Sequence, residues 1–180
     1  MIYATYEIVK DLIRPGDVIA FSGKGLISTL IRWKTRSIVT HVGCMLTKTA
    51  LIESTTLKRK KGVSIIPLQA RVESYKGCLW WFPLLPEVRE RMDWGAYGEF
   101  LTSHDGADYD TLQAIFSACL WWTREDFSKM FCSELVCGSL EVAGAIEDIN
   151  CSEQTPIDSL RFPIFTEYAQ IRGPWRDIGL

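Results

Sequence analysis

The stretch VTHVGCMLTKTALIEST, Val39 to Thr55, organises the N-terminal half of this chain. Its first part, VTHVGCMLT (Val39–Thr47), is rich in β-branched and apolar residues, and ALIEST (Ala50–Thr55) follows after a tight connection. Two such runs joined by a short turn are typical of a β-hairpin. His41 lies in the first expected strand and Glu53 in the second. If both side chains point to the same face of the hairpin, the carboxylate can accept a hydrogen bond from the imidazole.

Further strands are expected on either side of this hairpin. Short apolar runs with Pro or Gly at their ends are RPGDVIAFS (Arg14–Ser22), GVSIIPL (Gly62–Leu68) and CLWWFPL (Cys78–Leu84). Pro67 and Pro83 close the last two, because proline cannot donate to a sheet ladder. Asp17 is expected to hydrogen-bond within its own Pro-Gly-Asp turn. The first half of the chain is therefore predicted to form an antiparallel meander.

Helical spacing of apolar residues dominates the rest of the chain. The predicted helices are GLISTLIRW (Gly25–Trp33), PEVRERMDWGAYGEFL (Pro86–Leu101), YDTLQAIFSACLWW (Tyr109–Trp122) and CSELVCGSLEVAGA (Cys132–Ala145). Gly144 is expected to end the last of these. The following tail is predicted to be irregular. Together the patterns predict one α+β domain, residues 1–180, in which helices cover a set of strands.

Composition narrows the class of protein. The chain has 180 residues, 47% hydrophobic and 23% charged, which is an ordinary globular mixture and argues against disorder. A net charge of −2 does not favour a nucleic-acid partner. The N-terminus lacks a basic start followed by an apolar run, and no stretch is long enough for a stable membrane span. A cytoplasmic location is expected, with a phage-encoded or otherwise released product as the alternative.

The cysteines, the tryptophans and one basic run each allow more than one structural role. Without a visible export signal, the six cysteines are expected to be reduced thiols, most of them in the core. The seven tryptophans favour a heavy core over an exposed apolar groove. The basic run LKRKKG (Leu57–Gly62) is interpreted as a solvated turn between two strands, with a phosphate or lipid-headgroup patch as the less favoured reading.

FCSELV (Phe131–Val136) places a cysteine at the start of a predicted helix. Backbone N–H groups and the helix dipole favour the thiolate there, which is the nucleophilic form of cysteine. With His41 as base and Glu53 as the group that orients it, Cys132 completes a nucleophilic set. Such a set performs acyl transfer, to water or to another acceptor.

The segments RPGDVIAFS, THVGCML, LIEST, GADYD, FCSELV and TPIDSL resemble, in that order, the circularly permuted branch of the NlpC-type papain-like superfamily, the YiiX-like proteins. The resemblance runs from about Pro15 to about Leu160. It implies a permuted papain-like fold, in which an antiparallel half-barrel precedes the catalytic helix. It also implies that Cys132 is the nucleophile, His41 the base and Glu53 the third polar residue.

Three further residues are candidates for substrate contacts. The resemblance matches Tyr109 in GADYD to a family tyrosine near the site. It matches Phe131 to the aromatic residue, often tyrosine, that precedes the family cysteine. Phe131 keeps the ring without the hydroxyl, so no proton-handling role is assigned to it. Ser133 falls in the first helical turn, where a structural role is at least as favoured as a substrate contact. Cys44 is interpreted as core.

These observations predict a thiol-dependent hydrolase or acyltransferase that cleaves amide or ester bonds. The resemblance implies a peptidoglycan stem peptide or an acyl lipid as substrate, and no cofactor or metal is expected. The alternative is an inactive papain-like fold that binds an apolar ligand or a protein. A metal site of His41, Cys44, Cys132 and Cys137 is disfavoured, because His41 and Cys44 point to opposite faces of a strand.

Overall fold

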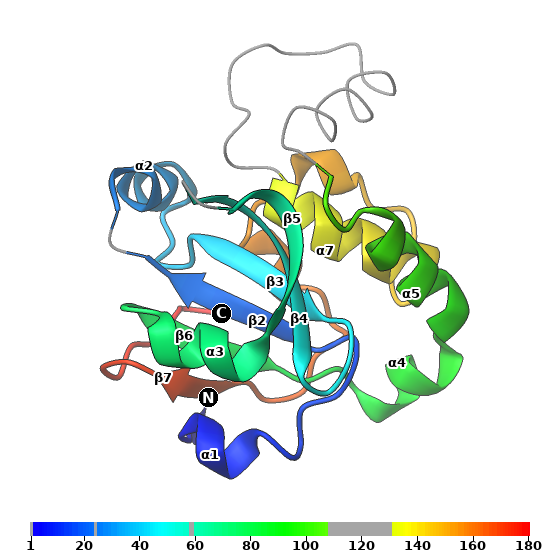
Figure 1. The fold of residues 1–180 in the computed structure, drawn as a ribbon, viewed down its shortest axis with the longest axis horizontal. Helices are drawn as coiled ribbons and strands as arrows, with labels where there is room; N and C mark the ends of the chain where they lie inside the picture. Colours follow the sequence, from blue (N-terminus) through cyan, green and yellow to red (C-terminus); the bar gives the residue numbers. More distant parts are fainter. Residues whose placement is uncertain (1, 24, 58–59, 108–130) are drawn as a thin grey trace.

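The computed structural model describes residues 2–23, 25–57, 60–107 and 131–180, and its centre is one seven-stranded sheet (Figure 1). In spatial order the strands are β1 (Ile2–Tyr3), β7 (Ala169–Arg172), β6 (Cys78–Phe82), β2 (Val18–Ser22), β3 (His41–Met45), β4 (Ala50–Leu57) and β5 (Lys60–Pro67). Neighbouring strands are antiparallel except β1 and β7, which are parallel.

The predicted hairpin is confirmed, whereas the predicted meander holds only in part. β3 and β4 pair with Cys44 opposite Ile52, and β2 to β5 follow one another across the sheet. β6 lies on the other side of β2 instead of extending the series beyond β5. All five residues of β6 are buried, so this strand needs covered faces and a neighbour on each side, which only the middle of the sheet provides.

The central strands bury alternate side chains in two separate cores. Val18 and Ala20 of β2 belong to the core under helices α4 (Pro86–Arg91), α5 (Trp94–Ser103) and α7 (Phe131–Val142). Ile19 and Phe21 belong to the core under α1 (Tyr6–Val9) and α3 (Leu68–Ser74). In β6 the tryptophans divide in the same way, with Trp80 in the first core and Trp81 in the second. Covering both faces explains why these strands read as continuous apolar runs.

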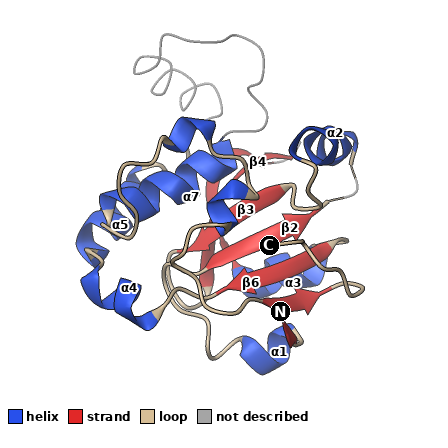
Figure 2. Ribbon diagram, turned by 180° about the vertical axis from the view of Figure 1, so that it is seen from behind, coloured by secondary structure: helices blue, strands red, loops and turns tan. Residues whose placement is uncertain are grey.

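Helix α7 (Phe131–Val142) corresponds to the predicted helix at Cys132 and packs on β3, β4 and α5 (Figure 2). The helix ends at Val142, and the expected terminating residue, Gly144, follows it in the left-handed conformation with a φ of +72°. The amide of Gly144 donates to the carbonyl of Glu141, and that of Ala145 donates to Leu140. This pair of hydrogen bonds is the Schellman motif, which satisfies the last carbonyls of a helix.

The single helix predicted over Pro86–Leu101 is two helices, α4 (Pro86–Arg91) and α5 (Trp94–Ser103). The chain is extended at Met92, and the carboxylate of Asp93 accepts a hydrogen bond from the amide of Ala96 at 2.9 Å. An aspartate in this position caps the start of a helix, so Asp93 favours a new helix over continuation of the first.

Several shorter elements have no counterpart in the predictions. They are the strands β1 and β7, the helices α1 (Tyr6–Val9) and α3 (Leu68–Ser74), and the 3₁₀ helices η1 (Cys151–Glu153) and η2 (Asp158–Leu160). Helix α2 (Leu26–Thr35) was expected, and the helix predicted over Tyr109–Trp122 lies outside the described residues. Among the described helices, none combines the length and apolar character needed to cross a bilayer.

Candidate active site

His41 and Glu53 form a hydrogen-bonded ion pair on the hairpin of β3 and β4. His41 Nε2 lies 2.8 Å from Glu53 Oε2, and the two side chains are 18% and 3% exposed. The register that pairs Cys44 with Ile52 places Gly43 next to Glu53, with His41 two residues along on the same face. Side chains in such diagonal positions are within reach of each other when they are long. The sheet register therefore brings together the two residues that the sequence singled out.

Gly43 leaves the space that the ion pair needs. A Cβ atom at this position would lie 2.9 Å from the carbonyl oxygen of Ile52 and 3.1 Å from Glu53 Cβ. Contacts this short force neighbouring atoms to shift, and the nearer of them belongs to the backbone. The glycine in HVG is thus explained by the close approach of β4.

Arg71, on helix α3, is the second cation at Glu53, and sequence reasoning missed it. Its Nε lies 3.0 Å from Glu53 Oε1, and its Nη2 donates to Oε2 at 3.2 Å. The guanidinium also lies over the rings of Phe21 and Tyr75, at 5.1 and 5.0 Å. The one available signal was the rule that a buried carboxylate needs a charged partner. Because helix α3 was not predicted, this rule could not identify Arg71 as the partner.

The two cations keep Glu53 ionised. Burial raises the pKa of this carboxyl, but the hydrogen bond and charge of His41, followed by those of Arg71, hold the pKa below its ordinary value. Glu53 is 2% exposed, so water screens these charges little. An ionised carboxylate at neutral pH fixes the orientation of the imidazole ring and stabilises its protonated form.

Cys132 reaches His41 from the opposite side of the sheet. Cys132 belongs to the core under α7 and is 8% exposed, whereas the ring of His41 packs 5.0 Å from Phe21 of the other core. Burial lowers the pKa of His41, but the charge of Cys132 and a hydrogen bond with its side chain, together with Glu53, raise that pKa to about 10. Because Nε2 faces Glu53, Nδ1 is the nitrogen left for Cys132.

The backbone around Cys132 adds hydrogen-bond donors. Cys132 is the second residue of α7, and the first four N–H groups of a helix have no acceptor within that helix. They point along the axis away from the helix, where negative charge is favoured. The arrangement thus combines a sulfur nucleophile, a proton carrier, a carboxylate that orients it, and donors suited to an oxyanion.

The three candidate substrate contacts are placed differently. Ser133 is fully buried, and its hydroxyl donates to the carbonyl of Gln154 at 2.6 Å, which ties α7 to the segment after η1. Phe131 begins α7, but its side chain is outside the described part, and Tyr109 lies outside the described residues altogether. Glu134, in the same helical turn, is 4% exposed, and burial raises its pKa to about 7.

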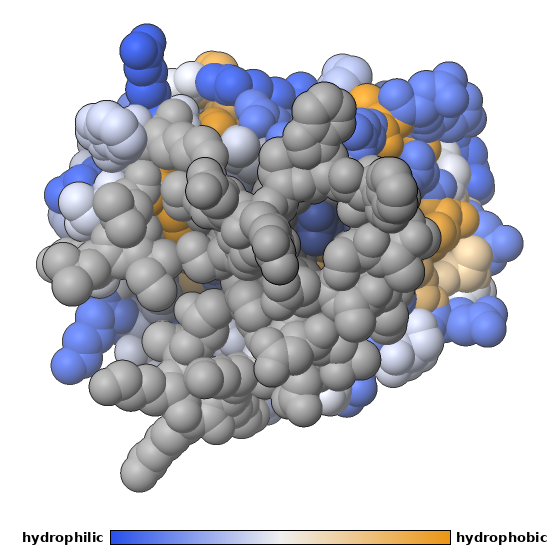
Figure 3. All heavy atoms as spheres, turned by 90° about the horizontal axis from the view of Figure 1, so that it is seen from above, coloured by the Kyte–Doolittle hydropathy of each residue, from blue (hydrophilic) through white to orange (hydrophobic). Residues whose placement is uncertain are grey.

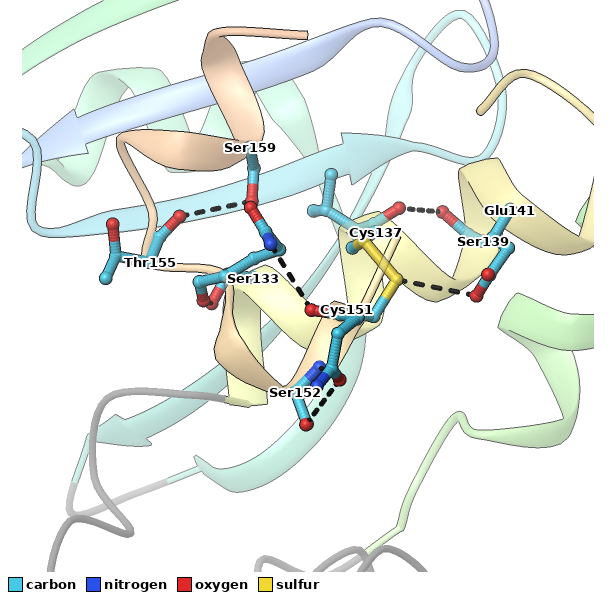
Figure 4. The surroundings of a disulfide bond; sticks show 11 residues. Ser133, Cys137, Ser139, Glu141, Cys151, Ser152, Thr155 and Ser159 are labelled. Atoms are coloured by element: carbon cyan, nitrogen blue, oxygen red, sulfur yellow. Dashed lines mark hydrogen bonds between the residues drawn. A yellow bond between two sulfur atoms is a disulfide. The ribbon is translucent and has the colours of Figure 1, made fainter. Parts of the chain in front are cut away.

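A disulfide joins Cys137 of α7 to Cys151 of η1, so the expectation that the cysteines are reduced is wrong for these two (Figure 4). Their Cα atoms are 5.4 Å apart, which is within the range that a disulfide requires. The number of cysteines in the sequence does not show which of them lie close together. That depends on how the segment after Gly144 returns to α7 and brings Cys151 next to Cys137. Disulfides persist mainly in oxidising surroundings, so the cysteines no longer support a cytoplasmic location.

The metal site considered from the sequence is not assembled. Cys137 is in the disulfide, and Cys44 lies in the core under α7, with its sulfur 3.8 Å from Ser139 Oγ. Burial raises the pKa of the Cys44 thiol to about 11, in keeping with its predicted core role. In the part of the chain that the structure describes, no three His, Cys, Asp or Glu side chains are grouped to hold a metal ion.

Comparison with known proteins shows a similarity of fold alone. No protein-family model matches the chain, and no curated protein matches it. Among solved structures it is similar to the crystal structure of the metalloprotein YiiX from Escherichia coli O157:H7, of DUF1105. The TM-score is 0.58 at 17% identity, and the match covers 91% of this chain and 99% of that one. The chain therefore has a YiiX-like α+β fold.

Proposed function

We propose that this protein is a thiol-dependent hydrolase or acyltransferase that cleaves amide or ester bonds through Cys132, His41 and Glu53. The observation that carries the proposal is the buried 2.8 Å pair between His41 and Glu53, with Cys132 as the strongest influence that raises the pKa of His41. A thiolate beside an imidazolium is the resting state that nucleophilic cysteine catalysis uses.

The reaction proceeds in two steps. The sulfur of Cys132 attacks the carbonyl carbon of the substrate, and the carbonyl oxygen takes up negative charge near the first N–H groups of α7. His41 gives its Nδ1 proton to the leaving amine or alcohol as the bond to the carbonyl carbon breaks. In the second step His41 takes a proton from water or another acceptor, which attacks the thioester and releases Cys132. Glu53 keeps the imidazole ring in position throughout.

The proposed architecture is a permuted papain-like fold. Two features support it: the strand that carries His41 precedes the helix that carries Cys132, and α7 packs directly against β3 and β4. The resemblance of the sequence motifs to the permuted NlpC-type branch agrees with this order. Peptidoglycan stem peptides and acyl lipids are the substrate classes that follow from the resemblance.

The word metalloprotein in the name of the similar structure suggests a competing role, in which Cys132, His41 and Glu53 hold a metal. The donor geometry does not favour it. Both oxygens of Glu53 face cations, with Arg71 at Oε1 and His41 at Oε2. Nδ1 of His41 and the sulfur of Cys132 would remain, and two ligands are fewer than a stable zinc site uses.

The deciding experiment is the alkylation rate of each cysteine as a function of pH, with mass spectrometry to locate the label. We expect Cys132 to react with iodoacetamide faster than any other thiol near neutral pH. Removing the base in His41→Ala lowers that rate at least tenfold, whereas His104→Ala, the matched control on the chain's other histidine, leaves it unchanged. Chelator treatment of the wild type leaves the rate unchanged if no metal blocks the thiolate.

Two outcomes would contradict the proposal. A slow Cys132 that is indifferent to His41 would leave a non-catalytic fold that binds an apolar ligand or a protein. A Cys132 that reacts only after chelation would favour the metal site. With a reactive Cys132 in hand, a panel of stem peptides and acyl esters follows, and we expect turnover on one class to be abolished by Cys132→Ala.

A further inference from the structure

Helix α2 and its flanking strands form a continuous cationic stretch. From Val18 to Ile52 the sequence has no Asp or Glu, although the whole chain is slightly acidic, with a net charge of −2. The cationic residues within this stretch are Lys24, Arg32, Lys34, Arg36 and Lys48. An even mixture of charges would place several carboxylates here. Positive charge is therefore concentrated on one part of a chain that is negative elsewhere.

Trp33 of α2 is exposed to an unusual degree. Its side chain is 82% exposed, the largest value among the large hydrophobic residues that are exposed in the described part of the chain. Ile31, two residues earlier, is 4% exposed and anchors the same helix. An exposed indole flanked in sequence by Arg32 and Lys34 is the combination found where proteins meet the headgroup region of a bilayer.

The helix lies at the end of the sheet where His41 begins β3. It lies in the connection from β2 to β3. The two ends of this connection are joined by a hydrogen bond from the amide of Gly23 to Thr40 Oγ1 at 3.0 Å. Thr40 immediately precedes His41. A surface that docks through α2 therefore holds its partner beside the candidate nucleophilic site.

A second basic segment lies next to α2. Figures 1 and 2 both place the end of β4 and the beginning of β5 beside this helix. The first two residues of β5 are Lys60 and Lys61. Figure 3, which looks onto this end of the molecule from above, shows mainly hydrophilic residues with smaller hydrophobic areas on its described surface.

We propose that α2 and the adjoining ends of β4 and β5 dock onto the surface of an anionic phospholipid membrane. Trp33 enters the headgroup region, and Arg32 and Arg36 contact the lipid phosphates. Two weak contributions act together, apolar insertion and attraction of the basic residues to a negative surface, as in other peripheral membrane proteins. If the proposed function also holds, the docked site faces acyl lipids, and these become the substrate class.

The test is flotation of the purified full chain with lipid vesicles, using Cys132→Ala so that no turnover alters the lipids. One set of vesicles contains phosphatidylcholine alone, and the other contains a third phosphatidylglycerol. We expect the protein to float only with the anionic vesicles, and high salt to release it, because exposed charges are screened. Binding by this variant does not depend on the proposed catalysis, so the two proposals fail separately.

Matched variants locate the surface. Trp33→Ala and Arg36→Glu are expected to weaken the binding at least fivefold. Trp175→Ala and Arg176→Glu make the same chemical changes at exposed residues beyond β7 and leave it unchanged. Circular dichroism and the thermal midpoint show whether each variant keeps its fold. Arg32→Glu, on α2, replaces Arg36→Glu if that variant unfolds.

Several results would overturn the proposal. Equal flotation with neutral and anionic vesicles would show that the basic residues do not contribute to membrane binding. Flotation that Trp175→Ala reduces as much as Trp33→Ala places the contact elsewhere. A protein that binds heparin but no vesicle identifies the basic stretch as a site for a soluble polyanion, and a protein that binds neither shows that α2 has another role.

Discussion

At the scale of single residues, Glu53 holds the candidate site together because it contacts two cations at once. Its Oε2 lies 2.8 Å from His41 Nε2, and its Oε1 lies 3.0 Å from Arg71 Nε. Arg71 is a positioning residue in this arrangement, since it contacts Glu53 and not the sulfur. Two measurements on individual side chains follow from these contacts.

Replacing Cys132 is expected to lower the titration midpoint of His41 by at least one pH unit. The charge and hydrogen bond of Cys132 are the strongest influences that raise the pKa of His41 to about 10. In Cys132→Ala, burial still lowers the pKa of His41, and Glu53 is left to raise it. Proton NMR of the imidazole C–H signals measures the midpoint directly, because the chain has two histidines and His104 provides an internal reference. An unchanged midpoint would mean that Cys132 and His41 do not interact.

Arg71→Met is expected to destabilise the protein by about 3–5 kcal/mol at neutral pH, the usual cost of breaking a buried ion pair. Glu53 has a folded-state pKa below its ordinary value of 4.5, so its contribution to stability is complete above pH 4.5 and is lost as the pH falls through the folded-state pKa. The difference between wild type and variant therefore shrinks in acid. Urea unfolding across this pH range measures it.

The control for this series is Arg161→Met, which removes an exposed pair with Asp158. We expect it to change the free energy of unfolding by less than about 1 kcal/mol, because solvent screens surface pairs. Equal effects of the two substitutions, or an Arg71→Met effect independent of pH, would show that Arg71 contributes only packing.

At the scale of elements, the site depends on how closely β3 and β4 approach and on what holds α7 behind them. Gly43 determines the first, since a Cβ there would be 2.9 Å from the carbonyl of Ile52. Two features hold α7 in place: the disulfide (Figure 4) and the hydrogen bond from Ser133 to Gln154. Both features act on the distance between Cys132 and His41 without touching either residue.

Gly43→Ala is expected to destabilise the protein by about 1–3 kcal/mol, the range for overpacking. The alkylation rate of Cys132 should fall with it, because β4 must shift and carries Glu53. Gly98→Ala is the control: nothing lies within 4 Å of its added Cβ, and alanine favours helix α5, so stability should rise by up to about 1 kcal/mol. Thermal unfolding and the alkylation assay measure both effects.

Breaking the disulfide is expected to cost about 3 kcal/mol, because the cystine closes a loop between residues 14 positions apart. Unfolding of the wild type with and without dithiothreitol shows the loss, and Cys151→Ser shows it without reductant and responds no further. Intact mass after alkylation under denaturing conditions counts the free thiols. A wild type with six free thiols after aerobic purification would contradict the pairing.

At the scale of the whole molecule, one buried carboxylate joins the turn before β2 to β6 and α4. Asp17 is fully buried and accepts a hydrogen bond from the amide of Arg14 at 2.8 Å within its own turn. It also accepts Trp81 Nε1 at 2.8 Å and the amide of Leu84 at 3.0 Å, and forms an ion pair with Arg89. The local hydrogen bond was expected, and the long-range ones were not.

Asp17→Asn is expected to destabilise the whole fold by about 3–5 kcal/mol, because an amide cannot accept all four donors and leaves Arg89 without its counter-ion. Glu7→Gln, which removes an exposed contact with Lys10, serves as the control and should cost less than about 1 kcal/mol. Chemical unfolding measures both. If Asp17→Asn lowers the free energy of unfolding as little as Glu7→Gln, then the contacts of Asp17 do not hold the turn before β2 to β6 and α4.

The sequence by itself determined what local patterns can encode. Apolar, β-branched runs with Pro or Gly at their ends placed β2 to β6, and the glycine at 144 placed the end of α7. Residue chemistry selected Cys132, His41 and Glu53 as candidates. The break between α4 and α5 was also encoded locally, in the capping residue Asp93, but the apolar spacing across it concealed the signal. In these elements each residue is specified by neighbours a few positions away.

Only the tertiary structure decided the features that join distant residues. These are the place of β6 beside β2, the contact of Arg71 with Glu53, the long-range bonds of Asp17 and the Cys137–Cys151 disulfide. Each depends on the register of the sheet and on which face a helix covers. Such contacts form because the central strands must be buried on both faces, and this requirement acts on the chain as a whole and not on any short window of it.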